Sequence, residues 1–262
     1  MLYVCIPSYN EAPTIGLLLW KIRQTFTAFP REYQLLVADD ASTDATAEVL
    51  APYARVLPLT VLRQAERRGY AASVESLLRL SLERTDRPKR DAAILMHADF
   101  SHNPAYLPDL VRRLDSGADM VVAEASLAGE ASRARRLVRR LGPWVLRRAV
   151  RVPGVSDVIS GFLAFRLVTL RHAVREHEDR LLTLDGWAAN AELIGKTARL
   201  ARRIDTVATV ERHDLRQRAS RVRPLDAALN LWRARGRLRL PPPPPPSPAP
   251  EPRAEREAGV TS

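Results

Sequence analysis

The first half of the chain alternates between short apolar runs, which indicate buried strands, and longer amphipathic stretches, which indicate helices. The predicted strands cover residues 2–6, 35–38, 56–62, 92–96 and 120–123. The predicted helices cover residues 15–26, 45–50, 70–82 and 104–114. Strands that alternate with helices favour βαβ units. The sequence therefore predicts an α/β fold with a mostly parallel sheet and helices on both of its faces.

Polar and charged residues directly follow these predicted strands. Residues 7–11 (Pro-Ser-Tyr-Asn-Glu) come after the first strand, and residues 39–44 (Asp-Asp-Ala-Ser-Thr-Asp) come after the second. Residues 97–104 (His-Ala-Asp-Phe-Ser-His-Asn-Pro) follow the fourth. Parallel strands bring their carboxyl ends to one edge, where open α/β sheets bind their ligands. These three loops, and the one that begins at Arg63, are therefore expected to share one rim.

Basic residues outnumber acidic ones, with 41 Lys and Arg against 30 Asp and Glu and a net charge of +11. Nearly all of the basic residues are arginine. The planar guanidinium of arginine can donate two parallel hydrogen bonds to phosphate oxygens. This favours a phosphate-bearing partner such as a nucleotide or a lipid headgroup, although genomic base composition alone also enriches arginine. No recognised nucleic-acid-binding module is present, so a nucleic-acid partner is not expected. The single cysteine, Cys5, excludes an internal disulfide and a cysteine-cluster metal site.

The second half of the chain holds two basic stretches with helical spacing. Residues 133–151 contain eight arginines and no acidic residue, and Gly142 with Pro143 is expected to split them into two short helices. Residues 212–239 form the second stretch. In this stretch, three apolar residues have the spacing of one helical face: Leu225, Leu229 and Trp232. Such helices can lie on an anionic membrane surface, or they can present a solvated arginine face above an ordinary core stripe.

The composition then changes to a tail rich in proline. Residues 241–262 begin with six consecutive prolines and are expected to be disordered, because they offer little apolar surface to bury. No apolar run approaches the roughly 20 residues needed to span a bilayer. The start of the chain also lacks the basic and then apolar pattern of a secretory signal. The sequence therefore predicts an intracellular protein without a membrane span.

Taken together, four segments resemble the family 2 glycosyltransferases. Three are the loops at residues 7–11, 39–44 and 97–104, and the fourth is the Asp-Val-Ile-Ser-Gly-Phe segment at residues 157–162. The fourth segment directs the resemblance towards the dolichol- or polyprenyl-phosphate mannosyltransferase branch. The resemblance implies a GT-A nucleotide-sugar domain over residues 1–211. The segments expected after it are the basic amphipathic segment 212–240 and the proline-rich tail 241–262.

The resemblance implies that the loops after the first three strands bind the nucleotide-sugar donor. The residues expected to line this donor site are Pro7, Tyr9, Glu11, Asp39, Asp40, Arg63 and Arg67. Asp39 is expected to contact the base or the ribose. The arginines would add fixed positive charge near the phosphates, where negative charge develops during sugar transfer.

The resemblance also implies a divalent metal, Mg²⁺ or Mn²⁺, that Asp99 holds at the donor diphosphate. Such a metal offsets the charge that grows on the diphosphate as the sugar bond breaks. The family's usual Asp-x-Asp reads His97-Ala98-Asp99 here, so the first carboxylate is missing. Three alternatives stay open: His97 is a substitute ligand, Asp99 holds the metal alone with water and phosphate, or catalysis is lost. Ser101 is expected to support the metal through water.

The acceptor implied by the resemblance is a lipid monophosphate. Its second pKa is about 6, so near pH 7 it is mostly a dianion that can attack without losing a proton. A hydroxyl acceptor would instead need a general base, for which Asp157 is the candidate. Asp157, Ser160 and Gly161 are expected to shape the acceptor pocket. The residues expected to bind phosphate beside it are Arg133, Arg216, Arg218 and Ser220.

The sequence thus predicts an inverting glycosyltransferase that moves a hexose to a polyprenyl or dolichyl phosphate. GDP-mannose is the first expected donor and UDP-glucose the second. The protein is expected to lie peripherally on the cytoplasmic face of the membrane, held by its lipid substrate, by charge or by a separate membrane-anchoring protein. The alternatives are transfer to a soluble glycan or protein hydroxyl, and a non-catalytic nucleotide-sugar-binding protein.

Overall fold

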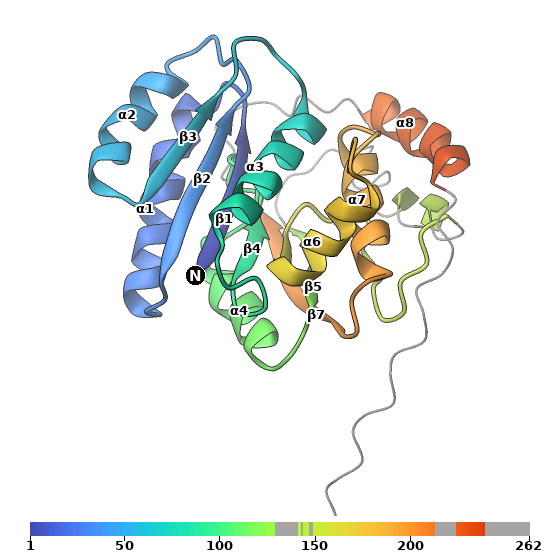
Figure 1. Ribbon diagram of the computed structural model, residues 1–262. Coiled ribbons are helices and arrows are strands. Elements are labelled where there is room, and N and C mark those ends of the chain that lie inside the picture. The colour runs from blue at the N-terminus through green and yellow to red at the C-terminus, as the bar shows by residue number, and fades with distance from the viewer. Residues whose placement is uncertain (129–140, 143, 147–148, 213–223, 239–262) are drawn as a thin grey trace, which may run out of the picture.

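A computed structural model of the chain describes residues 1–128, 141–142, 144–146, 149–212 and 224–238. A seven-stranded sheet runs through the centre of these residues (Figure 1). The strands are β1 (Leu2–Ser8), β2 (Tyr33–Asp39), β3 (Leu59–Arg63), β4 (Ala92–Leu95), β5 (Met120–Ala128), β6 (Leu163–Arg166) and β7 (Ile204–Arg212). Their order across the sheet is β3-β2-β1-β4-β6-β5-β7. All neighbours run parallel except β6, which is antiparallel to both β4 and β5. The predicted α/β class with a mostly parallel sheet is confirmed.

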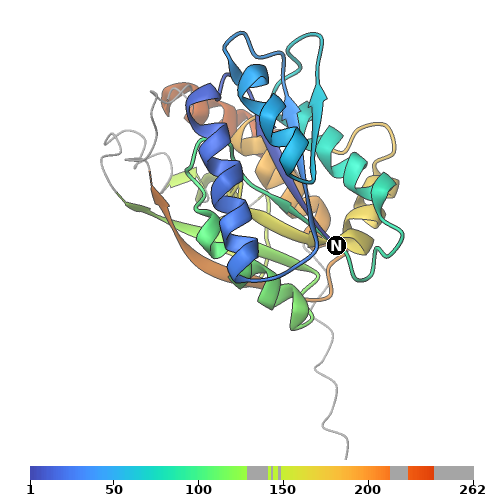
Figure 2. The ribbon, with the colours of Figure 1, turned by 90° about the vertical axis from the view of Figure 1, so that its left-hand side faces the viewer.

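Helices cover both faces of this sheet (Figure 2). They are α1 (Ala12–Ala28), α2 (Thr46–Val56), α3 (Tyr70–Arg84), η1 (Pro104–Tyr106), α4 (Leu107–Asp115), α6 (Leu167–Glu176), α7 (Trp187–Ala198) and α8 (Pro224–Arg237). Side chains of β1 alternate between the two cores, because successive residues of a strand point to opposite faces. Val4 and Ile6 pack with α1, α2 and α4, whereas Tyr3 and Cys5 pack with the layer that holds α3, α6, α7 and α8.

The third strand was predicted to begin too early. Residues 56–62 were expected to form it, but α2 continues to Val56 and β3 begins at Leu59. The helix passes through Pro52, which lacks an N–H group and usually ends a helix. It continues because Tyr53, beyond the proline, packs against the core on the α1 side. Tertiary burial therefore overrides the local signal.

Hydrophobic periodicity did not predict α7, although this helix lies at the centre of the second half. Eleven of its twelve residues are buried. A helix that is buried all round has no apolar stripe beside a polar face, so it lacks the periodicity that reveals amphipathic helices. The edge strand β7 and the four-residue strand β6 were not predicted either.

The predicted basic segments lie only partly within the described residues. Of residues 133–151, the structure describes 141–142, 144–146 and 149–151, and the tail at 241–262 lies outside the description. In the second segment the helix begins at Pro224 and packs on the core through Leu231, Ala234 and Leu238. Leu229 and Trp232, which were expected to share one helical face, are both exposed. No helix in the described part of the chain is both long and apolar enough to cross a bilayer.

Candidate active site

The loops after β1, β2, β3 and β4 share one edge of the sheet, as predicted. In the strand register Ser8 stands opposite Asp39, and Asp39 stands opposite Arg63. The first two loops are joined by hydrogen bonds. The backbone N–H of Asn10 donates to the Ser42 hydroxyl at 2.8 Å, and the Thr43 N–H donates to the Asn10 side chain at 2.7 Å. These bonds give the edge a fixed shape.

Backbone strain is concentrated at this edge. Among the described residues other than glycine, a left-handed backbone occurs at Asn10, Ala41 and Phe100, with φ of 50°, 55° and 61°. These residues follow β1, β2 and β4 respectively. A left-handed non-glycine residue is held only where the surrounding structure stabilises it, and such residues cluster at binding and catalytic sites. The strain therefore marks this edge as the candidate site.

Buried polar atoms without hydrogen-bond partners also lie here. In the described part of the chain these atoms are Ser8 Oγ, Asp39 Oδ2 and Gln64 Oε1, at the ends of β1, β2 and β3. Asp39 is 1% exposed; its Oδ1 accepts the Ser42 N–H at 3.0 Å, while Oδ2 has only an ionic contact of 3.9 Å with Arg63. An unpaired buried polar atom is costly, because it has lost its hydrogen bonds to water. These atoms are suited to meet the polar groups of a ligand.

The rest of the expected donor site surrounds these atoms. The Arg67 guanidinium lies over the Tyr9 ring, 4.1 Å from its centre, a cation–π contact. Pro7 is the next-to-last residue of β1, and the buried Glu11 carboxylate accepts the Thr14 hydroxyl at 3.0 Å. The structure thus brings these expected donor residues to one end of the sheet.

Asp40 differs from its neighbour Asp39, because both of its oxygens accept backbone N–H groups. Arg68 N donates to Oδ1 at 2.7 Å and Gly69 N donates to Oδ2 at 2.9 Å. Asp185 accepts the Ala71 N–H at 2.9 Å. The two carboxylates therefore satisfy the amino end of α3, where helical N–H groups lack partners within the helix.

The connection between α6 and α7, which carries the second of these carboxylates, is itself held by two acidic side chains. Glu75 accepts the backbone N–H groups of Leu181 and Leu182, both at 3.0 Å. Glu192 accepts the next two backbone N–H groups and the Lys196 ammonium, the latter at 2.7 Å. Burial by itself would raise the pKa of both carboxyl groups, but these donors hold each pKa below its ordinary value.

Asp99 lies in the loop after β4 and is 7% exposed. Its Oδ1 accepts both the backbone N–H of Ser101 at 3.1 Å and the Ser101 hydroxyl at 2.6 Å. The backbone N–H of His97 donates to Nδ1 of His102 at 3.1 Å. The His102 ring stacks between His97, at 4.3 Å, and Phe162, at 4.9 Å. The loop that presents Asp99 is therefore tied to the segment that contains Phe162.

A partly buried polar network extends from this loop to α3 and α7. The Tyr70 hydroxyl lies 3.3 Å from Nε2 of His97 and donates to Oδ1 of Asn190 at 2.8 Å. The Asn190 amide in turn donates to the carbonyl of Ile159 at 3.3 Å. Burial raises the pKa of Tyr70 far above its ordinary value, so the phenol keeps its proton. Tyr70 and Asn190 were not predicted as site residues, because no local spacing links them to His97.

The acceptor-side residues are described only in part. The Asp157 carboxylate accepts the Ile159 N–H at 3.3 Å, and the Ser160 hydroxyl donates to the Ala123 carbonyl at 2.7 Å. Gly161 packs directly against the His97 ring. The expected phosphate-binding residues that lie outside the described part of the chain are Arg133, Arg216, Arg218 and Ser220.

The oxygen atoms at Asp99 fit a hard divalent cation that also binds a ligand. In the residues that the structure describes, no group of three or more His, Cys, Asp and Glu side chains could hold a metal ion. Mg²⁺ is commonly bound by one or two carboxylates together with water and substrate phosphates. Asp99 could supply such a carboxylate, with the remaining positions taken by a diphosphate and water.

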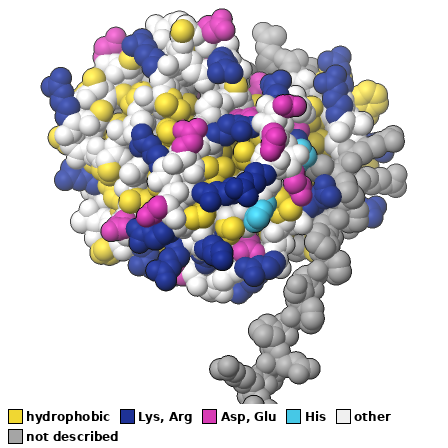
Figure 3. Space-filling view, in the orientation of Figure 1, with side chains coloured by type: hydrophobic (Ala, Val, Ile, Leu, Met, Phe, Trp, Pro, Cys, Tyr) yellow, Lys and Arg dark blue, Asp and Glu magenta, His cyan; other side chains and the backbone are white. Residues whose placement is uncertain are grey.

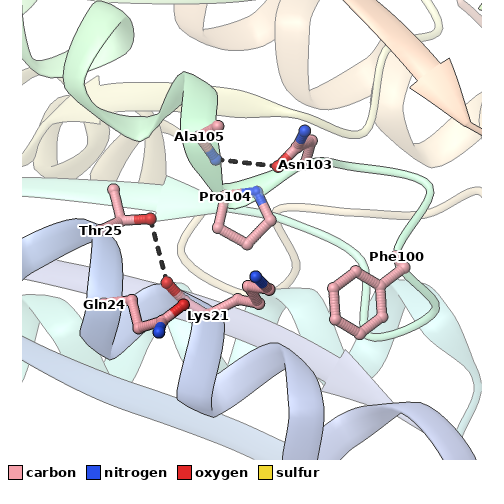
Figure 4. A pocket seen from close by; sticks show the side chains of 7 residues that line it. All are labelled: Lys21, Gln24, Thr25, Phe100, Asn103, Pro104 and Ala105. Carbon is pink, nitrogen blue, oxygen red and sulfur yellow. Dashed lines mark hydrogen bonds between the residues drawn. The ribbon is translucent and has the colours of Figure 1, made fainter.

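A cavity of about 470 Å³ lies beside the Asp99 loop (Figure 4). Lys21, Gln24 and Thr25 of α1 line one side of it, and Phe100 and residues 103–105 line the other. None of the predicted site residues lines this cavity. We therefore regard it as a neighbour of the candidate site and not as part of it.

Comparison with known proteins agrees with this geometry. The sequence model of the family described as Glycosyl transferase family 2 matches residues 3–172. A dolichol-phosphate mannosyltransferase of Pyrococcus furiosus is 26% identical over 168 residues, which are 62% of this chain and 45% of that protein. A polyprenol monophosphomannose synthase of Mycolicibacterium smegmatis is 28% identical over 168 residues, 62% of this chain and 60% of that protein. The chain thus matches about half of the length of these relatives.

Solved structures share the fold. Mannosyl-3-phosphoglycerate synthase from Rubrobacter xylanophilus superposes with a TM-score of 0.64 at 20% identity, over 90% of this chain and 73% of that one. Glucosyl-3-phosphoglycerate synthase from Mycobacterium tuberculosis, in complex with Mn²⁺, UDP and glucosyl-3-phosphoglycerate, gives 0.59 at 21% identity, over 89% and 76%. The expected GT-A-type α/β fold is confirmed. Since the family model covers more than half of its length, the chain belongs to glycosyl transferase family 2.

Proposed function

We propose that this chain transfers a hexose from a nucleotide diphosphate to a polyprenyl or dolichyl phosphate, with mannose from GDP-mannose as the first candidate. The relatives named as dolichol-phosphate mannosyltransferase and polyprenol monophosphomannose synthase support this choice of sugar and acceptor. The observation that carries the proposal is the set of unpaired polar atoms at the ends of β1 to β3. A nucleoside would supply the donors and acceptors that these atoms lack.

The diphosphate of the donor would lie at Asp99. A bound Mg²⁺ or Mn²⁺ would offset the charge that develops on the leaving diphosphate. The part of this chain is to present the Asp99 carboxylate in a fixed orientation, through the two hydrogen bonds from Ser101. On the other side of the donor site, Arg63 and Arg67 add positive charge.

In the transfer step an oxygen of the lipid phosphate attacks the anomeric carbon of the sugar from the face opposite the diphosphate. The new carbon–oxygen bond forms as the bond to the diphosphate breaks, and the nucleoside diphosphate leaves with the electron pair. The configuration at the anomeric carbon is inverted. The phosphate dianion carries no proton on the attacking oxygen, so this step needs no general base. With a hydroxyl acceptor, Asp157 would have to take the proton.

We also propose that the protein binds an anionic membrane surface next to this site, on the cytoplasmic face. Two neighbouring segments expose large apolar side chains: Leu141 and Trp144 in one, Leu229 and Trp232 in the other. The segments are in contact, since a Cβ added at Gly142 would lie 3.1 Å from Leu231. The exposed arginines of α8 are Arg233, Arg235 and Arg237. Aromatic side chains with arginines are suited to a headgroup layer.

The distribution of charged side chains supports a membrane-binding surface at α8. On the face that carries α3, α6 and α7, basic and acidic side chains are interspersed (Figure 3). At the edge where α8 lies, basic and hydrophobic side chains are both exposed. A separate membrane-anchoring protein could add to this attachment.

The proposed activity is tested with the full chain, polyprenyl phosphate, Mn²⁺ and labelled GDP-mannose or UDP-glucose. We expect the mannose label to move into the organic phase, and Asp99→Asn to lower this transfer by roughly 100-fold or more. Asp109→Asn, which changes an exposed aspartate of α4, serves as the matched control. With a soluble glycan added as a competing acceptor, label that moves only to the glycan would overturn the lipid acceptor. Transfer from UDP-glucose alone would overturn the donor.

A further inference from the structure

We propose that His97 is a positioning residue that ties the Asp99 loop to α3 and α7, and that it does not ligate the donor metal. This inference rests on the proposed function, because it concerns the metal expected at Asp99. It selects one of the alternatives left open by the sequence, in which Asp99 holds the metal together with water and phosphate.

Both ring nitrogens of His97 lie against protein hydroxyl groups. Nε2 is 3.3 Å from the Tyr70 hydroxyl, and Nδ1 is 3.3 Å from the Ser101 hydroxyl. An imidazole nitrogen has one in-plane direction, which serves either a hydrogen bond or a metal bond. In this arrangement both directions are used within the protein.

The two hydroxyl groups have already given their protons to other acceptors. Tyr70 donates to Asn190 at 2.8 Å, and the amide of Asn190 is oriented by its own bond to the Ile159 carbonyl. Ser101 donates to the Asp99 carboxylate at 2.6 Å. A neutral imidazole carries a single N–H, so one of the two hydroxyl oxygens accepts from the His97 ring. The other ring nitrogen also lies 3.3 Å from a protein hydroxyl oxygen.

Packing also prevents the ring from turning towards a metal. The Tyr70 ring meets it edge-on at 5.6 Å, and the His102 ring stacks on it at 4.3 Å. On a further side lies Gly161, where even a single added carbon would stand 2.5 Å from Nε2. A rotation of His97 would break its contacts with the two hydroxyl groups and require its neighbours to move.

The consequence is a continuous chain of contacts from α7 to the metal carboxylate. It runs from Asn190 through Tyr70, His97 and Ser101 to Asp99. The Ile159 carbonyl at its far end belongs to the segment expected to shape the acceptor pocket. His97 thus links the orientation of Asp99 to the acceptor side.

The test uses the full chain with Mn²⁺ and GDP, and pulsed electron paramagnetic resonance of the bound Mn²⁺. We expect no hyperfine coupling from a directly coordinated imidazole nitrogen in the unmodified protein. His97→Phe keeps a flat ring in the stack but removes both nitrogens. It is expected to leave the Kd for Mn²⁺ within twofold, whereas Asp99→Asn weakens it at least tenfold.

Catalysis gives a second measurement. His97→Phe and Tyr70→Phe are each expected to lower kcat about tenfold with little change in KM, and the double variant is expected to be no slower than either. His172→Phe, far from this network at the other end of the sheet, is the control. A nitrogen coupling that disappears in His97→Phe would overturn the inference while leaving the proposed function intact. If Mn²⁺ does not bind the unmodified protein with GDP, the proposed function fails and this inference fails with it. If His97→Phe does not fold, the spectrum of the unmodified protein still decides.

Discussion

A Cβ added to Gly161 would lie 2.5 Å from Nε2 of His97, closer than unbonded atoms approach. The same Cβ would lie 3.1 Å from the side-chain amide of Asn190. Gly161 is therefore required by the contact between two loops and not by its own backbone conformation. The space that glycine leaves is filled by the ring that connects Asp99 to Tyr70.

Gly161→Ala is expected to lower the free energy of unfolding by about 1–3 kcal/mol, the usual cost of overpacking a filled site. Urea unfolding would measure the loss. Gly236→Ala is the control, because the corresponding Cβ in α8 meets nothing within 4 Å. That change is expected to be neutral or to stabilise the helix by up to about 1 kcal/mol. An unchanged unfolding midpoint for Gly161→Ala would contradict the close contact.

Asp39→Asn and Asp40→Asn are expected to differ in their effects on stability. Asp39 has an oxygen without a hydrogen-bond partner, so removing its charge should stabilise the free protein or leave it unchanged. Asp40 accepts a backbone N–H at each oxygen, so Asn at that position loses a charged hydrogen bond worth about 1.5–3 kcal/mol. Thermal unfolding of the two variants compares them directly.

The same two variants distinguish an effect on nucleotide binding from an effect on stability. Asp39→Asn should weaken GDP binding by roughly 10- to 100-fold, because an acceptor is replaced by an amide donor. Isothermal titration calorimetry would measure this change. Equal losses of stability in both variants, with GDP affinity kept in Asp39→Asn, would refute the assignment of Asp39 to the nucleoside.

The connection between α6 and α7 should lose stability as the pH falls. The pKa values of Glu75 and Glu192 are lowered in the folded protein, so their contribution is complete above the ordinary value near 4.5. It is lost as the pH falls through the lowered values. Glu192→Gln should reduce this loss between pH 5 and pH 3, and at pH 7 it should cost about 3 kcal/mol, since Lys196 is left without its buried partner.

Urea unfolding across this pH range, with hydrogen exchange at Leu182 and Leu184, would measure the effect. Glu178→Gln changes an exposed carboxylate of the same connection and serves as the control. If Glu192→Gln and the unmodified protein lose the same stability on acidification, the lowered pKa of Glu192 is not supported.

Removing the exposed tryptophans near α8 should weaken membrane binding. The double change Trp144→Ser and Trp232→Ser is expected to lower partitioning onto vesicles that contain anionic lipid by roughly tenfold or more, since each side chain buries apolar surface in the interface. Trp20→Ser is the matched control, because Trp20 is 42% exposed on α1, in the opposite layer of the fold. Co-sedimentation with anionic and with neutral vesicles measures both. Equal losses in the control would contradict the proposed surface.

Much of the donor side of the site could be predicted from local sequence. The strands that end at Ser8 and Asp39 were recognised by their apolar runs, and parallel pairing brings their ends to one edge. The acceptor side of the site was harder to predict from local sequence. Its framework depends on α7, whose burial all round removes the periodic pattern, and on contacts such as that between Tyr70 and Asn190, which are 120 residues apart.

The face of α8 illustrates a similar limit. Spacing placed Leu229 and Trp232 on one apolar face, but the helix packs through Leu231, Ala234 and Leu238. A basic helix with apolar residues on two sides has two orientations of similar pattern. Contact with the core selects one of them.

The order of strands, helices and polar loops along the chain by itself determined the fold class, the family and the edge at which the donor loops meet, because periodicity and parallel pairing are local or topological properties. Only the tertiary structure decided which of two adjacent aspartates keeps an unpaired oxygen and where the His97 ring points. The physical reason is that a side chain's hydrogen-bond partners are set by residues distant in sequence, such as Arg68 and Gly69 for Asp40 or Tyr70 for His97.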